Sequence, residues 1–237
     1  MDLDLNRRSR ANLLASWEEY ARASAGAAVH HLPGVSVAVF PSEPERAVYN
    51  NAFLEPGAAA VAAMEAVYRA AGIGDFAAWV HESDGPGRSR LEQRGYAVAE
   101  HTRAMARELV SLPRPGLVPE PAGWAEYLAF AGLPAGLLAT ADHTALHPLA
   151  VREGGVIVAA ALAYDHCGDC GIYNVATAPH ARRRGLATAL TLAQLHAAAG
   201  RGCTTASLQS SPMAERVYAG VGFRDLGRIL EYRRVGH

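Results

Sequence analysis

The residues best suited to chemistry stand in an arginine-rich turn that contains one glycine. Residues 178–187 read APHARRRGLA. The preceding residues, Gly171 to Thr177, are typical of a strand, and the residues that follow the turn are typical of an amphipathic helix. One face of that helix is formed by Leu186, Ala189, Leu190 and Ala193. The sequence therefore predicts a strand, a turn and an exposed helix N-terminus in succession.

Such a turn is suited to hold a pyrophosphate. Backbone N–H groups without partners point out of the first turn of a helix, and the helix dipole places about half a positive charge there. Gly185 lets a phosphate approach the backbone without meeting a Cβ, and Ala187 keeps a second position small. Planar donors for phosphate oxygens come from Arg182, Arg183 and Arg184. The alternative is a solvated arginine cluster at the start of an ordinary amphipathic helix.

With this turn in place, the C-terminal half of the chain, about residues 124–234, resembles the GNAT superfamily of acyl-coenzyme A dependent N-acetyltransferases. The phosphate loop of that family has the form Q/R-x-x-G-x-G/A, which Arg182, Gly185 and Ala187 match. Residues 174–177 and Pro179 look like the splayed fourth strand of the family and its usual proline. A later family element, A-x-x-V/L-Y-x-x-x-G-F, is matched by Ala214, Val217, Tyr218, Gly222 and Phe223.

The resemblance implies acetyl-coenzyme A as the acyl donor, and the sequence motifs lead us to expect no metal. Pantetheine would pair with the splayed strand as a further strand does, and an N–H near Val175 would face the thioester oxygen. The pyrophosphate would contact the backbone from Arg183 to Thr188. The donor-binding residues implied in this way are Val175, Ala176, Thr177, Arg182, Arg183, Arg184, Gly185, Leu186, Ala187, Thr188 and Ser211.

Acyl transfer from a thioester to an amine also needs a proton for the departing thiolate. Tyr218 is the candidate acid, because a phenol with a pKa near 10 keeps its proton at neutral pH. The alternative is that Tyr218 only packs in the core. No residue is chosen as general base, although Asp165, His166 and Glu231 are near expected strand ends.

The chain shows signs of an internal duplication. A Pro-rich stretch predicts a linker over residues 113–123 between domains 1–112 and 124–237. Three short matches relate the two flanks, and they pair Tyr49–Ala52 with Tyr173–Ala176, Gly72 with Gly200 as helix C-caps, and Gly95 with Gly222. We therefore expect an α/β fold with a mixed, mostly antiparallel sheet flanked by helices, present as two GNAT-like halves in tandem.

The first half lacks the residues expected to do chemistry. Glu55 and Pro56 stand where the second half has its arginine-rich turn, and a carboxylate disfavours anion binding. Leu91 stands where the second half has Tyr218. We therefore expect the first half to be a degenerate copy that supports the second and helps to shape its acceptor groove.

Composition excludes several classes of function. The 237 residues include 22 basic and 23 acidic side chains, so no net field favours nucleic acid or an anionic membrane. Every basic residue is Arg, which excludes P-loop and Schiff-base lysines. The pair Cys167 and Cys170 lacks companions at zinc-site spacing and is set aside as a reduced turn. With three cysteines and no signal-peptide pattern, a cytoplasmic location is expected.

The expected activity is transfer of an acetyl group from acetyl-coenzyme A to a primary amine of a small molecule or peptide. Two alternatives stay open at this point. One is a catalytically idle acyl-coenzyme A binding module that acts as a sensor or partner subunit, and the other is transfer to a hydroxyl or thiol acceptor. The sequence leaves the acceptor, the base, the acyl chain length and the oligomeric state open.

Overall fold

Two compact units make up the computed structural model, which describes residues 2–134, 140 and 144–235. Unit 1 comprises residues 1–16 and 104–226, and unit 2 comprises residues 17–103 and 227–237. Their boundaries differ from the expected domains 1–112 and 124–237. The physical reason is that β5 (Tyr96–Glu108) ends in unit 1, whereas β11 (Arg224–Arg234) ends in unit 2.

Unit 1 contains a mixed sheet with the strand order β5-β10-β9-β8-β7-β6. β9 and β10 are parallel, and the pairs β6 with β7, β7 with β8 and β8 with β9 are antiparallel. The strands that lie wholly in this unit are β6 (Glu120–Pro121), β7 (Leu146–Glu153), β8 (Val156–His166), β9 (Asp169–Thr177) and β10 (Thr205–Ser210).

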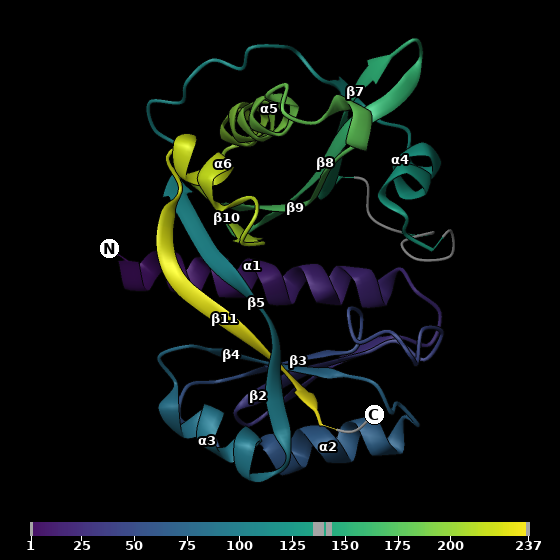
Figure 1. Ribbon diagram of the computed structural model, residues 1–237, viewed down its shortest axis with the longest axis vertical. Helices are drawn as coiled ribbons and strands as arrows, with labels where there is room; N and C mark the ends of the chain where they lie inside the picture. Colours follow the sequence, from purple (N-terminus) through teal and green to yellow (C-terminus); the bar gives the residue numbers. More distant parts are fainter. Residues whose placement is uncertain (1, 135–139, 141–143, 236–237) are drawn as a thin grey trace. The chain divides into compact units, whose positions relative to one another are not determined.

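Helices cover the sheet of unit 1. α5 (Leu186–Gly200) packs on β8 and β9, and the first part of α1 (Asp2–Arg22) lies on the opposite side of β9 (Figure 1). The other helical segments of this unit are α4 (Trp124–Ala131), the 3-10 turn η1 (Pro179–Ala181) and α6 (Glu215–Gly220). The helix expected after the arginine-rich turn is confirmed, with Leu186, Ala189 and Leu190 buried.

A buried polar contact fixes α1 on the sheet of unit 1. Asn12 is fully buried, and its Nδ2 donates to the carbonyls of Tyr164 (3.1 Å) and Asp169 (3.0 Å). Its Oδ1 accepts a hydrogen bond of 2.6 Å from the Tyr173 hydroxyl. Gly171 lies under this contact, and a Cβ on Gly171 would overlap Asn12 Oδ1 and the Tyr173 ring. The glycine is therefore required by close packing.

We expect Gly171→Ala to lower the free energy of unfolding by about 2 kcal/mol, because the methyl group has to displace Asn12 or Tyr173. Gly200→Ala is the matched control, since Gly200 ends α5 and a Cβ there meets nothing within 4 Å. That control should be as stable as the wild type or more stable. Urea unfolding followed by circular dichroism measures both, and equal stability of Gly171→Ala and wild type would contradict the packing argument.

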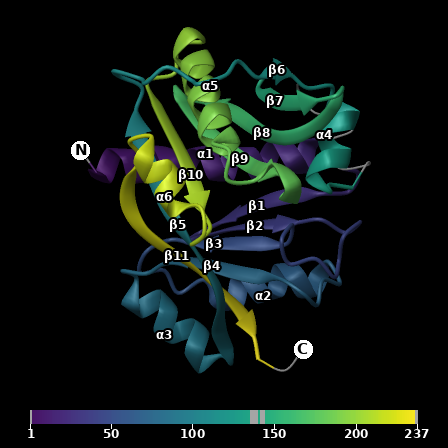
Figure 2. The same ribbon diagram turned by 45° about the horizontal axis from the view of Figure 1, so that its top comes forward.

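Unit 2 has a sheet and helices of its own. Its sheet has the strand order β1-β2-β3-β4-β11, which Figure 2 shows side by side for β1 to β4. β3 and β4 are parallel, and the pairs β1 with β2, β2 with β3 and β4 with β11 are antiparallel. The elements that lie wholly in this unit are β1 (Ala28–Leu32), β2 (Val35–Val39), β3 (Asn51–Leu54), α2 (Val61–Ala70), β4 (Ala77–His81) and α3 (Gly85–Gln93).

The helix ends correct one of the expected matches between the halves. Gly72 follows the C-cap of α2 with φ of 70°, as expected for a C-terminal glycine. In unit 1, however, Gly200 is the last residue of α5, and Gly202 with φ of 96° takes the left-handed position. The pairing of Gly72 with Gly200 was therefore wrong by two residues, because α5 continues further before it ends.

Glu65 on α2 is a buried carboxylate that binds three side chains of unit 2. Its side chain is 6% exposed, and it pairs with Arg94 and, at 3.1 Å, with Arg234. The Tyr96 hydroxyl donates to it at 3.2 Å. The hydrogen bonds from Arg94 hold the pKa of this carboxyl below its usual value, against the opposing effect of burial. The contact ties α2 to residues on two strands.

Glu65→Gln should lower the free energy of unfolding by about 2 kcal/mol at pH 7, because it leaves buried donors facing a neutral amide. Since the folded-state pKa is lowered, the wild-type advantage is complete above the unfolded pKa of about 4.3 and is lost as the pH falls below it. Glu45→Gln, at an exposed site, is the control. A stability difference that stays constant from about pH 7 to about pH 3 would refute the role of the ion pairs.

The Pro-rich stretch is part of unit 1. The Pro113 carbonyl lies 2.9 Å from Nε2 of His196 on α5, and Glu120 and Pro121 form β6 beside β7. Residues 113–123 therefore lie along unit 1 and do not mark the boundary between the units. The expected mixed sheet flanked by helices is confirmed within each unit. Among the described residues, no helix combines the length and apolar character that a bilayer crossing needs.

Candidate functional site

The arginine-rich turn links β9 to α5 through two left-handed residues. Arg183 has φ of 61° and Gly185, the N-cap residue of α5, has φ of 77°. A Cβ on Gly185 would meet no protein atom within 4 Å, so its backbone conformation, and not crowding by neighbours, requires the glycine. The turn therefore leaves open space directly before the helix.

The first turn of α5 offers unused backbone donors. The N–H groups of Leu186, Ala187 and Thr188 precede the first intrahelical bond, which Ala189 donates to the Gly185 carbonyl at 3.0 Å. No side chain caps this helix. Gly185 is exposed, and Ala187 and Thr188 are partly exposed. These amides and the helix dipole favour an anion at this place.

The three arginines of the turn differ in their contacts. Arg182 Nε donates to the Thr177 carbonyl at 3.2 Å, which ties the turn to the end of β9. Arg184 pairs with Glu153 at the end of β7. Within the described residues, the Arg183 guanidinium has no recorded partner and is exposed. The sequence predicts planar donors from all three arginines, but of these side chains only that of Arg183 has no partner among the described residues.

β9 is irregular before it reaches the turn, although it stays paired with β8 as far as Thr177. Ala160 pairs with Ala176 and Leu162 pairs with Tyr173, so two residues, Asn174 and Val175, stand opposite one on β8. This is a β-bulge, and Asn174 adopts a left-handed φ of 49° within it. The bulge explains how a strand can change direction within one sheet.

The parallel pairing of β9 with β10 is short. It covers Asp169–Gly171 against Thr205–Ser207, although β9 continues to Thr177 and β10 to Ser210. Beyond these residues the two strands separate. The Ala178 N–H donates to the Val158 carbonyl on β8 at 2.8 Å. Backbone groups of successive strand residues point to alternate sides. Since the Ala178 N–H faces β8, the backbone groups of Val175 and Thr177 face away from β8, toward the gap between β9 and β10.

Tyr218 lies on α6, in the apolar cluster against which Val175 also packs. The ring is 7% exposed and contacts Phe223 edge to face, with 5.9 Å between ring centroids. Burial raises the pKa of the phenol to about 12. Ser211 follows β10 and is exposed. Since β9 and β10 are parallel, the turn before α5 and the segment from Ser211 to Tyr218 follow strand ends at the same edge of the sheet.

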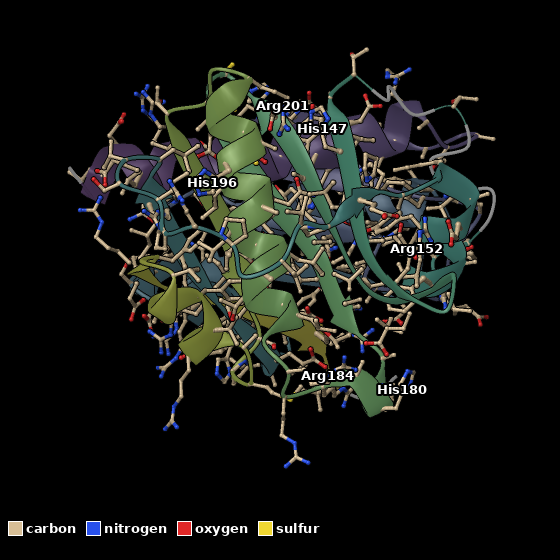
Figure 3. All side chains as sticks on the ribbon, turned by 90° about the horizontal axis from the view of Figure 1, so that it is seen from above. His147, Arg152, His180, Arg184, His196 and Arg201 are labelled. Carbon is tan, nitrogen blue, oxygen red and sulfur yellow. The ribbon has the colours of Figure 1, made fainter. Side chains whose placement is uncertain are left out.

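Two of the residues considered as general base lie at the other end of α5. Asp165 accepts two hydrogen bonds from Arg201, at 2.5 and 3.0 Å, and lies 3.5 Å from His147. Burial opposes ionisation, but these partners outweigh it and hold the pKa of Asp165 well below its usual value. Figure 3 shows Arg201 and His147 at one end of α5 and Arg184 at the other. His166 is the next residue after Asp165, whereas Glu231 belongs to unit 2.

Cys167 lies at a hairpin tip, as expected, whereas Cys170 lies within β9. His166 pairs with Asp169, and the two residues between them, Cys167 and Gly168, both have positive φ. Cys167 is exposed and Cys170 is buried. Within residues 2–134, 140 and 144–235, no three His, Cys, Asp or Glu side chains gather in a group able to hold a metal ion.

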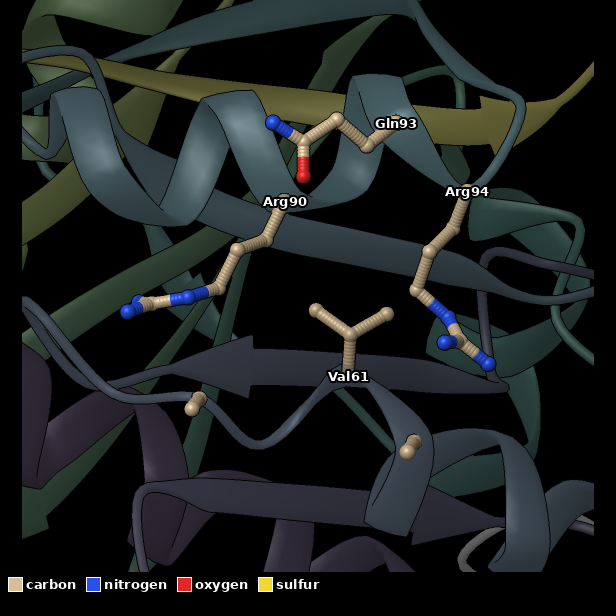
Figure 4. A pocket seen from close by; sticks show the side chains of 6 residues that line it. Val61, Arg90, Gln93 and Arg94 are labelled. Atoms are coloured by element: carbon tan, nitrogen blue, oxygen red, sulfur yellow. The ribbon is translucent and has the colours of Figure 1, made fainter.

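The turn after β3 in unit 2 is closed by side chains of that unit. Asp84 accepts the Gly57 N–H at 3.1 Å, and Arg90 donates to the carbonyls of Gly57 and Ala58. A hollow of about 200 Å³ remains nearby, between α2 and α3 (Figure 4). It is lined by Ala59, Val61, Ala62, Arg90, Gln93 and Arg94. Glu55, expected to face the phosphate position, is exposed.

The separating strand pair and the exposed helix N-terminus that the family resemblance led us to expect are both present. The chain belongs to the acetyltransferase (GNAT) family, because the sequence model of that family matches residues 104–223. The matched range begins where the second segment of unit 1 begins, at residue 104. No curated protein is similar to the chain in sequence.

Solved structures share the fold over most of the chain. A GCN5-related N-acetyltransferase from Kribbella flavida is 21% identical, with a TM-score of 0.73 and 96% of each chain covered. A second from Sphaerobacter thermophilus is 15% identical, with a TM-score of 0.60 and coverage of 85% of this chain and 80% of that one. A putative GNAT acetyltransferase from Novosphingobium aromaticivorans is 19% identical, with a TM-score of 0.58 and coverage of 91% and 96%. These likenesses concern the fold.

One buried residue near the site is not indicated by any sequence motif. Tyr127 on α4 is fully buried, burial raises the pKa of its phenol, and the Asn174 side chain partly offsets that shift. The only signal in the sequence was the spacing of Trp124 and Tyr127, whose stacked rings have centroids 5.7 Å apart.

Proposed function

We propose that the protein transfers an acetyl group from acetyl-coenzyme A to a primary amine of a small molecule or peptide, and that unit 1 carries the site. The observation that supports this best is the separation of β9 from β10 after Gly171 and Ser207, directly before an uncapped helix. The outward backbone groups of Val175 and Thr177 suit an amide-containing chain such as pantetheine, which they would bind as a strand edge.

The turn before α5 suits the other end of the donor. Backbone amides from Arg183 to Thr188 would hold the pyrophosphate, with Gly185 leaving room for close approach. Ser211, exposed after β10, would contact pantetheine from the opposite strand. An ion pair already occupies Arg184, so in this proposal Arg183 supplies the free charge.

In the proposed reaction, the amine nitrogen forms a bond to the acetyl carbon and the C–S bond of the thioester breaks. The amine loses one proton, and the sulfur gains one to leave as a thiol. The N–H near Val175 would stabilise the charge on the thioester oxygen. Tyr218 would donate the proton to sulfur, because its high pKa keeps it protonated at neutral pH.

A second candidate is an acyl-coenzyme A binding module without turnover. It is favoured by the positions of Asp165 and His166, which lie at the end of α5 away from the turn and so leave the proton of the amine without an evident acceptor. Transfer to a hydroxyl or thiol would use the same donor site. The expected cytoplasmic location is compatible with each of these functions.

We also propose that the two halves arose by duplication and that the N-terminal copy is degenerate. Each unit has two antiparallel hairpin pairings, then a parallel pair joined through a helix. Leu91 on α3 and Tyr218 on α6 each precede a left-handed glycine by four residues. The closed turn at Gly57 is consistent with loss of donor binding in that copy.

The test combines donor titration with a turnover assay. Calorimetric titration with acetyl-coenzyme A should show one site, and release of free thiol across a panel of amines should identify acceptors. Binding without thiol release on any amine, alcohol or thiol would support the binding module. Absence of binding would overturn both proposals.

A further inference from the structure

Arg107 is a buried arginine whose side chain donates a hydrogen bond to the C-terminal end of α6. It lies near the end of β5 and is 8% exposed. Its guanidinium donates to three backbone carbonyls, those of Glu108 at 3.0 Å, Val110 at 3.1 Å and Val221. Burial lowers the pKa of this guanidinium, yet an arginine stays charged at neutral pH. A buried cation is therefore held here by carbonyl oxygens.

Val221 is the C-cap residue of α6, the helix that carries Tyr218. The carbonyls at the end of a helix lack intrahelical partners and carry partial negative charge, so a guanidinium there is well placed. Both the Val221 and the Phe223 N–H donate to the Tyr218 carbonyl, at 3.1 and 3.0 Å. Arg107 thus holds the same turn of backbone that fixes Tyr218.

Gly222 leaves the room that this contact needs. It has φ of 88°, and a Cβ on it would come within 2.9 Å of Arg107 Nη1. A glycine is therefore needed at position 222 for two reasons. One is its left-handed backbone conformation, and the other is the Arg107 guanidinium, which leaves no room for a Cβ. The arrangement joins a strand before the Pro-rich stretch to the helix that holds the candidate acid.

We propose that Arg107 is a positioning residue for Tyr218. It fixes the last turn of α6, and through it the place of the phenol, without touching the substrate. This inference rests on the proposed function, in which Tyr218 is the acid. A residue of this kind should affect kcat through Tyr218 and leave the binding of the donor nearly unchanged.

A double-mutant cycle tests the coupling. We expect Arg107→Gln to lower kcat about 10-fold with the dissociation constant of acetyl-coenzyme A within about 2-fold of wild type, and Arg107→Lys to recover part of the loss. In a Tyr218→Phe background, Arg107→Gln should lower kcat by less than about 2-fold. Equal losses in both backgrounds would overturn the proposal.

Arg224→Gln is the matched control. Arg224, the first residue of β11, forms a 2.6 Å ion pair with Glu108 at the end of β5. Both of these side chains are more than one-third exposed. Its removal should leave kcat within about 2-fold of wild type, because exposed pairs contribute little. A loss as large as that of Arg107→Gln would assign the effect to general loosening of β5.

A spectroscopic measurement separates this inference from the proposed function. In protein labelled with 3-fluorotyrosine, the 19F resonance of Tyr218 is the one that Tyr218→Phe removes. Arg107→Gln, or Arg107→Lys if the first variant does not fold, should shift that resonance, and Arg224→Gln should not. An unmoved resonance overturns the positioning role even where no turnover is found, whereas a moved one without turnover overturns only the transferase.

Discussion

Replacing Tyr218 with Phe should lower kcat about 100-fold, which is the usual contribution of a positioned general acid. The ring is buried against Phe223, and the substitution keeps its shape while it removes only the hydroxyl. The dissociation constant of acetyl-coenzyme A should stay within about 2-fold of wild type, because the proposed donor contacts lie on β9 and the turn before α5. Steady-state kinetics and calorimetry measure the two effects.

The energetics of proton transfer sharpen this expectation. With a phenol pKa of about 12, transfer to a thiolate of ordinary pKa near 8.5 is uphill by about 5 kcal/mol. A thiolate buried beside the phenol also loses hydration, so its pKa rises and the difference shrinks. Tyr218 should therefore act while the C–S bond breaks.

The pH dependence follows from the same shift. The acid must be protonated to act, so its contribution is complete well below pH 12 and is lost only as the pH approaches that value. Any falling limb of kcat below about pH 10 should persist in Tyr218→Phe. Loss of such a limb in the variant would contradict the raised pKa.

A matched control distinguishes catalysis from packing. Tyr164 is a buried tyrosine on β8, close to the end that carries Asp165 and away from the turn before α5. Tyr164→Phe should leave kcat nearly unchanged. Equal losses of kcat and donor affinity in Tyr218→Phe would instead assign Tyr218 a packing role.

Gly185→Val should raise the dissociation constant of acetyl-coenzyme A about 100-fold or more. Valine at φ of 77° strains the backbone, and its branched side chain fills the open space in which a phosphate would approach the amides. No protein atom lies within 4 Å of the new Cβ, so the fold itself should survive. Calorimetric titration with the donor measures the effect, and an unchanged affinity would refute the phosphate-binding role of the turn.

The opposite end of α5 provides a control of equal strain. Gly202 has φ of 96°, and a Cβ on it also meets no atom within 4 Å. Gly202→Val should cost similar stability and leave donor affinity unchanged. Gly185→Asn is a useful third variant, because asparagine tolerates the left-handed conformation. Retained binding in Gly185→Asn would show that backbone conformation, and not the missing Cβ, is what the donor requires.

Local features of the site could be predicted from the sequence because neighbouring residues determine them. The strand Gly171–Thr177, the turn and the start of α5 at Leu186 follow from apolar spacing and one glycine, and the structure confirms them. The family resemblance added the splay of β9, and the short pairing with β10 confirms it. Donor binding by these residues remains a prediction.

Long-range features could not be predicted in this way. Nothing near Arg107 indicates that its guanidinium meets Val221, which is 114 residues later in the chain. Pro-rich composition indicated a linker over residues 113–123, but strand pairing and His196 hold this stretch on unit 1. The base could not be chosen from strand ends, because Asp165 is already bound by Arg201.

The division of β5 and β11 between the units bears on how such a protein evolves. Each half of the gene encodes a strand that completes the compact unit formed mainly by the other half. A genetic recombination within the codons for residues 113–123 would separate each compact unit from one of its strands. We therefore expect the two halves to be inherited together, although only one of them is expected to bind acetyl-coenzyme A.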